Sequence, residues 1–232
     1  MANPIKPIGD ILILGGDVIL FGLMESHGDF FNYVSDNFEK VFWLPGNHEY
    51  YYYDLANRSS VLNEKIRSNV LLVNNITVNQ GDLHLVFSTL WTHISPLNQL
   101  AIQKGMSDFK VIQYKGKPFT PAHYNDLHQA CRNFLTDEFS KKYKKSIVVT
   151  HHVPTLLHYP EQYRNSILNE GFAVELYDLI ESSNAQYWIY GHHHQVVPPF
   201  KIRATTLLTN QLGYVHYQEH LGFDNEAFIE IA

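Results

Sequence analysis

The chain has 232 residues, of which 45% are hydrophobic and 14% aromatic, and its formal net charge is −6. This length suits one large domain, and because no linker-like tract or internal repeat interrupts it, we expect a single domain over residues 1–232. The negative charge argues against a nucleic-acid-binding surface, since binding to the phosphate backbone needs a basic one. The single cysteine, Cys131, excludes an intrachain disulfide.

The beginning of the chain, residues 1–7, contains no apolar signal core. No apolar run approaches the roughly 20 residues that are needed to span a bilayer. We therefore expect a cytoplasmic protein with no membrane partner. The basic cluster at residues 141–145 is typical of the solvated end of a helix.

Short apolar runs that stop at glycine, histidine or a turn predict buried strands. In chain order the predicted strands are 11–14, 41–44, 70–73, 76–78, 83–89, 146–150, 187–190, 205–209 and 227–231. Asn74 and Asn75 predict a two-residue turn in an antiparallel region. Mixed or helical periodicity predicts helices at 22–38, 50–67, 121–142 and 172–180. This pattern predicts a mixed α/β fold with two packed sheets.

Four polar motifs each follow a predicted strand: Gly15-Gly16-Asp17, Gly46-Asn47-His48-Glu49, Thr150-His151-His152 and Gly191-His192-His193-His194. The carboxyl ends of parallel strands meet at one edge of a sheet, where α/β folds assemble their sites. Carboxylate, amide and imidazole groups are ligands for divalent metals. The motifs together therefore predict a metal site.

Each motif also has an ordinary structural explanation. Asp17 and Asn47 suit helix N-caps, and Glu49 suits the first turn of a helix. The histidine pair and triplet suit polar surface turns. In an extended loop, however, residues 192 and 194 lie on one side and residue 193 on the other. Four such accidents at four strand ends are much less probable than one shared site.

In this order and spacing, Asp17, Gly46-Asn47-His48-Glu49, His151 and Gly191-His192-x-His194 resemble the calcineurin-like metallophosphoesterase superfamily. The resemblance runs from about residue 10 to residue 214. It implies a two-sheet mixed β-sandwich flanked by helices, with two divalent transition metals (Mn, Fe, Zn or Ni) at the strand ends. The implied activity is hydrolysis of a phosphate mono- or diester.

The resemblance also implies roles for individual residues. One metal would be held by Asp17, Asn47, His151 and His192, with Asp17 bridging to a second metal held by His194. His48 would be the catalytic histidine, which protonates the leaving oxygen or stabilises the transition state. Residues expected to line the substrate pocket are Asn47 and His152, together with His93, which is included because it follows a predicted strand end.

One part of the family pattern is absent, because no Asp-x-His motif precedes Asp17. Asp10 is an unsuitable replacement, since seven residues at ~3.3 Å place it about 23 Å from Asp17, and His27 is expected on a helix or loop. We expect one strong and one weak metal site, as a result either of truncation or of natural loss. An alternative function is a non-catalytic metal-binding or interaction module that retains the fold.

The missing motif would ordinarily lie on an internal strand of the sheet. Its loss should expose a strand edge. We expect either another segment or a second copy of the chain, as a homodimer, to cover that edge.

Overall fold

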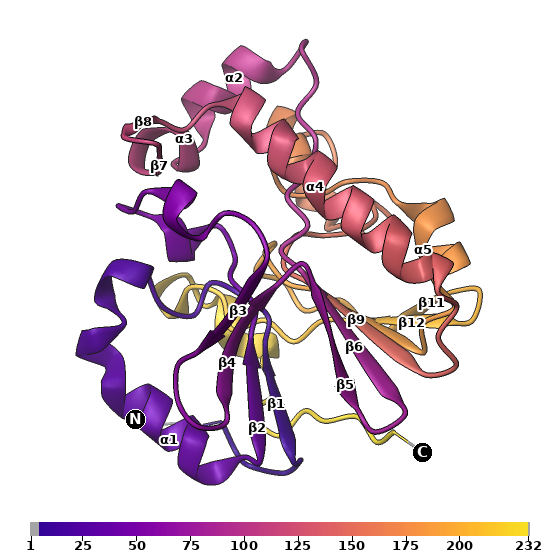
Figure 1. Ribbon diagram of the computed structural model, residues 1–232. Coiled ribbons are helices and arrows are strands. Elements are labelled where there is room, and N and C mark those ends of the chain that lie inside the picture. Colours follow the sequence, from indigo (N-terminus) through magenta and orange to yellow (C-terminus); the bar gives the residue numbers. More distant parts are fainter. Residues whose placement is uncertain (1–4, 232) are drawn as a thin grey trace.

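A computed structural model describes residues 5–231 and shows two β-sheets packed face to face (Figure 1). Residues 1–4, part of the segment without a signal core, lie outside the described residues. The first sheet has the order β1-β2-β4-β3, and the second has the order β11-β12-β10-β9-β6-β5. The fold class predicted from the sequence is confirmed.

The strands of the first sheet are β1 Ile11–Leu14, β2 Lys40–Trp43, β3 Leu62–Lys65 and β4 Val70–Asn74. Those of the second are β5 Ile76–Gln80, β6 Leu83–Ser88, β9 Ser146–Thr150, β10 Tyr187–Ile189, β11 Phe200–Ile202 and β12 Thr205–Leu208. In the first sheet β1, β2 and β4 are parallel. In the second, β6, β9, β10 and β12 are parallel. The motifs that follow β1, β2, β9 and β10 therefore leave the carboxyl ends of parallel strands.

Alternating side chains divide the core into layers. Phe42 of β2 and Phe87 of β6 belong to one apolar cluster, with ring centroids 5.3 Å apart. Their neighbours Val41 and Trp43 belong to the other cluster, together with residues of α1. This alternation follows from the two-residue period of a strand that is buried on both faces.

Helices cover the outer faces of both sheets (Figure 1). They are α1 Gly28–Asn37 on the first sheet, and α4 Pro121–Ser140 and α5 Tyr177–Ser183 on the second. Thr120 caps α4 by accepting the backbone N–H of His123, and Pro121 occupies its first turn. The helix predicted at 121–142 is thus confirmed, whereas those predicted at 22–38 and 172–180 begin later than expected, at residues 28 and 177.

A long excursion separates β6 from α4 and stands above the sheets (Figure 1). It comprises α2 Gln99–Gly105, α3 Asp108–Val111, and the short strands β7 Gln113–Tyr114 and β8 Lys117–Pro118. Its helix α3 carries a buried aspartate to the site described below.

Two predictions between β2 and β6 were wrong. Residues 50–67 form no long helix: a 3-10 turn ends at Tyr50, and a second one, Leu55–Arg58, precedes β3. Tyr52 has a positive φ of 59°, which ends a helix, and residues 62–65 pair with β4 instead. Asn74 and Asn75 do not form a hairpin turn, because β4 and β5 belong to different sheets. The antiparallel hairpin is β5–β6.

The strand predicted at 227–231 was also wrong, since this segment is not a strand. Ile229 and Ile231 are partly buried and alternate with exposed residues, and their side chains pack against the same buried cluster as Ile11 and Ile13 of β1. Among the described strands β1 pairs only with β2, so it is an edge strand. The C-terminal segment forms no described ladder with β1, and pairing between two chains stays a prediction.

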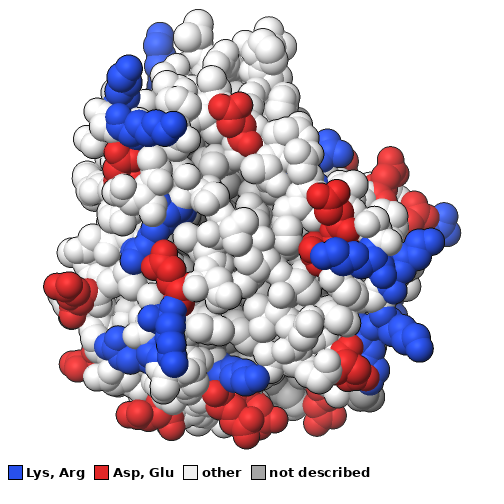
Figure 2. Space-filling model, in the orientation of Figure 1, with Lys and Arg blue, Asp and Glu red and all other residues white. Residues whose placement is uncertain are grey.

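The surface in this orientation carries acidic and basic side chains interspersed around a mostly uncharged centre (Figure 2). Across residues 5–231, no helix is both long and apolar enough to cross a membrane.

Candidate metal centre

Asp17 follows β1 in a left-handed backbone conformation, with φ 58°. Its Oδ1 accepts the backbone N–H of His48 at 2.9 Å, which ties the loop after β1 to the loop after β2. Gly16, with φ 101°, passes so close to His151 that an added Cβ would lie 2.2 Å from Nδ1 of that ring. A glycine is therefore required where these two loops meet.

Asn47 is held in one amide orientation by a residue of the excursion. Its Nδ2 donates to Oδ1 of Asp108 at 2.9 Å, and both side chains are buried. Because the NH2 group is used in this way, Oδ1 of Asn47 faces the opposite direction, toward Nε2 of His151 at 3.3 Å.

His151 lies at the centre of the site. Its Nδ1–H donates to the carbonyl of Gly15 at 2.9 Å, so the neutral ring has a lone pair on Nε2. That Nε2 lies 3.4 Å from Oδ2 of Asp17 and 3.0 Å from Nδ1 of His192. The atoms of Asp17, Asn47, His151 and His192 thus turn toward one small space, as ligands of a cation do. A backbone carbonyl behind the histidine ring is also typical of metal-binding histidines.

Two buried polar atoms at this point have no hydrogen-bond partner among the described residues. They are Oδ2 of Asp17 and Nε2 of His192. Leaving such atoms unpaired costs about 1–3 kcal/mol each, so unpaired groups in a native structure call for an explanation. A bound divalent cation explains the Asp17 oxygen, and the residues present fit such an ion.

The electrostatics agree with this fit. Burial would raise the pKa of Asp17, but the imidazoles of His151 and His48 outweigh burial and hold this pKa well below its usual range. Burial would lower the pKa of His151, but the Asp17 carboxylate outweighs it and raises the pKa. Burial, with His152 close by, holds the pKa of His192 well below its usual range. The site therefore combines one carboxylate with a neutral His192 and attracts positive charge.

Glu49 links the loop after β1 to the loop after β2 through hydrogen bonds. Its Oε2 accepts backbone N–H groups from Asp17 at 2.8 Å and from Gly46 at 2.7 Å. Its Oε1 accepts the N–H groups of Val18 at 2.6 Å, Ile19 at 3.4 Å and the indole of Trp43 at 3.2 Å. Burial and the Asp17 carboxylate raise its pKa, but all five partners are donors, which fits an ionised acceptor.

His48 lies beside this cluster with its side chain 26% exposed. Its ring stacks on Tyr51 at 4.3 Å between centroids, and its Nδ1 lies 4.0 Å from Oδ2 of Asp17. Tyr51 in turn donates to Oδ2 of Asp108 at 3.1 Å. Asp108 therefore supports both the Asn47 amide and the ring against which His48 packs.

His194 does not join the other predicted ligands. Its Nδ1 lies 3.0 Å from Oε2 of Glu219, and its ring centroid lies 6.5 Å from that of His48. The cluster of possible ligands found among the described residues contains Asp17, His151 and His192 but not His194. His192 and His194 both have positive φ, 77° and 54°, so the loop is not the extended one assumed from the sequence.

His152 and His93, the two other residues predicted to contact substrate, do not lie at a solvent-accessible face of the metal cluster. His152 is fully buried, with Nδ1 3.1 Å from the carbonyl of Thr89 and Nε2 3.2 Å from the hydroxyl of Tyr124. Its ring packs 4.3 Å from that of His192, so it supports a ligand and offers no surface to a substrate. His93 is exposed, with its ring 5.7 Å from His128, and is not part of the cluster.

The excluded replacements Asp10 and His27 also lie outside the cluster of possible ligands. The residues that sequence reasoning missed are Asp108, Tyr51 and Glu219, which contact Asn47, His48 and His194. Tyr51 belongs to the run of tyrosines at residues 50–53, directly after the Asn47-His48 motif, whereas Asp108 and Glu219 lie in segments with no pattern that points to a site.

Comparison with known proteins agrees with this geometry. The pattern of the family described as calcineurin-like phosphoesterase matches residues 2–196. The chain belongs to this family. An uncharacterized protein, L509, of Acanthamoeba polyphaga mimivirus is 30% identical over 220 residues, which cover 87% of this chain and 77% of that protein.

The fold is also shared with a solved structure, the phosphopantetheinyl hydrolase PptH from Mycobacterium tuberculosis. The TM-score is 0.62 at 17% identity, covering 89% of this chain and 80% of that one. Membership of the calcineurin-like phosphoesterase family supports a phosphoester hydrolase and implies the use of divalent metal.

Proposed function

We propose that the protein is a metal-dependent hydrolase of phosphate mono- or diesters. The observation that carries this proposal is the convergence of Asp17, His151 and His192 on one buried point, where Oδ2 of Asp17 has no hydrogen-bond partner among the described residues. Asn47 would be the fourth ligand, because Asp108 turns its amide oxygen toward His151.

A divalent cation at this site would supply charge stabilisation for the phosphoryl group and activation of water. Asp17, Asn47, His151 and His192 would hold it. His48 would interact with the leaving oxygen and give it a proton, since it is the partly exposed imidazole beside the cluster. Stacking on Tyr51 would hold its ring in place.

The second cation site would be the weaker one. Its expected ligands are Asp17 and His194, and Nδ1 of His194 is already paired with Glu219. This pairing also favours the second candidate function, a module that binds one metal without turnover. The two functions differ in whether a metal-loaded chain hydrolyses any ester.

The test measures Mn bound per chain by elemental analysis, together with hydrolysis of bis(p-nitrophenyl) phosphate and p-nitrophenyl phosphate. We expect about one Mn in the wild type. His151→Ala should lose both Mn and turnover, whereas His48→Ala should keep Mn and lose roughly 10²–10⁴-fold in turnover, the usual contribution of a general acid. His27→Ala, an exposed histidine outside the cluster, is the matched control and should change neither.

Full Mn loading without hydrolysis of either ester would exclude the hydrolase and favour the binding module. Two tightly bound metals would contradict the weak second site. Equal turnover in His48→Ala and wild type would remove His48 from the reaction.

A further inference from the structure

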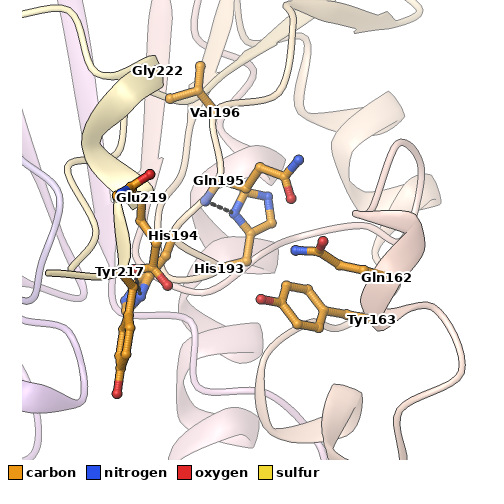
Figure 3. A pocket seen from close by; sticks show the side chains of 10 residues that line it. Gln162, Tyr163, His193, His194, Gln195, Val196, Tyr217, Glu219 and Gly222 are labelled. Atoms are coloured by element: carbon orange, nitrogen blue, oxygen red, sulfur yellow. Dashed lines mark hydrogen bonds and ion pairs between the residues drawn. The ribbon is translucent and has the colours of Figure 1, made fainter. Parts of the chain in front are cut away.

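A second feature lies next to His194. It is a cavity of about 310 Å³ between the 3-10 turn Glu161–Tyr163 and the C-terminal turns Val215–Tyr217 and Glu219–Gly222 (Figure 3). This volume is at the lower end of the range for small-molecule sites, about 300–1,000 Å³. Because His194 borders it and the His194 ring is 6.5 Å from that of His48, the cavity adjoins the proposed reaction site.

The cavity carries a single carboxylate as its only acidic group and is otherwise rich in uncharged hydrogen-bonding groups. The amides of Gln162, Gln195 and Gln218 border it, and none of its described lining residues is lysine or arginine. Its one carboxylate, Glu219, contacts Nδ1 of His194 at 3.0 Å and accepts the backbone N–H of Tyr214 at 2.6 Å, both through Oε2. Such a lining is unsuited to a second phosphate, which needs positive charge, and suits an uncharged polar group.

The cavity also contains an oriented donor. Gln211 accepts the backbone N–H of His194 through Oε1, so its NH2 group points to Nδ1 of His193 at 2.7 Å. Nδ1 of His193 is therefore the acceptor and the ring hydrogen lies on Nε2. Across residues 5–231 nothing hydrogen-bonds to this Nε2, and His193 lines the cavity, so an N–H donor is free for a ligand.

Two tyrosine rings flank this polar centre. Tyr163 and Tyr217 lie on opposite sides of the cavity (Figure 3), and these residues are 42% and 69% exposed. Exposed aromatic faces stack on planar heterocycles, and amide side chains match the donor and acceptor edges of such rings.

We propose that this cavity binds the nucleobase of a nucleotide ester whose phosphate lies at the cluster of Asp17, His151 and His192. The inference rests on the proposed hydrolase function and deepens it by naming the substrate class. The phosphate and the base would lie on either side of His194, so one substrate would contact both places.

The test compares three diesters with the same leaving group: the p-nitrophenyl esters of thymidine 5′-phosphate and ribose 5-phosphate, and methyl p-nitrophenyl phosphate. In each, water adds to phosphorus and p-nitrophenolate leaves, so differences in kcat/KM report recognition of the remaining organic group. We expect the Mn-loaded wild type to prefer the thymidine ester over both others.

Tyr163→Ala should lower the ratio of kcat/KM for the thymidine ester to that for the methyl ester by roughly 5- to 150-fold, as loss of one base–aromatic stack does. Gln129→Ala, an exposed glutamine on α4, should leave this ratio unchanged. Equal preference for the ribose and thymidine esters would overturn the base assignment in favour of a sugar. An unchanged ratio in Tyr163→Ala would refute the assignment of this cavity as the nucleobase site.

Failure of the hydrolase proposal is distinguished by a binding measurement. If no ester is hydrolysed, calorimetric titration with thymidine 5′-phosphate still tests the cavity. Binding that weakens in Tyr163→Ala would support it, and an absence of binding, or equal affinity in both proteins, would refute it.

Discussion

Replacement of Glu49 by glutamine should strongly destabilise the protein, although the two side chains have nearly the same shape. One carboxylate oxygen accepts two N–H donors and the other accepts three. In either orientation the new NH2 group faces at least two buried N–H groups. With about 1.5–3 kcal/mol for each hydrogen bond to a charged acceptor, the loss is about 3–6 kcal/mol, a large part of a typical 5–15 kcal/mol total.

Urea unfolding followed by circular dichroism, with EDTA present so that bound metal adds no stability, measures this loss. The m-value should be unchanged if both proteins unfold from the same compact state. Glu64→Gln is the control, because Glu64 pairs with Arg58 at 3.0 Å at a partly exposed position and should lose less than about 1 kcal/mol. A loss below about 1 kcal/mol in Glu49→Gln would refute the view that this carboxylate holds the ligand loops together.

Four further expectations concern the same site and the sheet edge. Asp108→Ala frees the Asn47 amide to turn and should weaken Mn binding about 10- to 100-fold by calorimetry; unchanged affinity would contradict this. Gly16→Ala should abolish Mn binding through the contact with the His151 ring, whereas Gly15→Ala, where an added Cβ meets nothing within 4 Å, should retain it. Burial lowers the pKa of His152 from 6.5 to about 3, so the unfolded state binds more protons between these values and stability falls as pH drops from 6.5. The free energy of unfolding should fall by about 2 kcal/mol between pH 6.5 and pH 5 for this reason. In His152→Gln the free energy of unfolding, measured with urea at each pH, should lack this decrease. Light scattering should show a dimer if β1 edges pair, and a strictly monomeric chain would exclude that pairing.

The parts of the fold that were predictable are those that depend on the sequence of a short segment alone. Short apolar runs ended by Gly15 or Gly46 identify strands buried on both faces, and the polar residues after them mark the edge where parallel strands end. This local signal alone predicts that the four motifs meet in one site, whereas the choice of His151 over His152 as a ligand rests on the family resemblance.

The remainder depends on contacts between distant segments. Asp108 reaches Asn47 across 61 residues, and nothing in the sequence around it distinguishes it from a surface aspartate in a short helix. Local sequence favours a helix at residues 62–65, whereas pairing with β4 is what makes them a strand. The separation of His194 from the cluster depends on the positive φ of two histidines, which an extended-loop assumption excludes.

The left-handed backbone at Asp17, His192 and His194 has a consequence for laboratory evolution of this chain. Each non-glycine residue in that region is strained by roughly 1–2 kcal/mol, which glycine would relieve. Selection for heat resistance alone would favour glycine at position 194, where the side chain is only partly buried. Variants selected for thermostability without an activity screen should therefore lose His194, the histidine that lies between the metal cluster and the adjoining cavity.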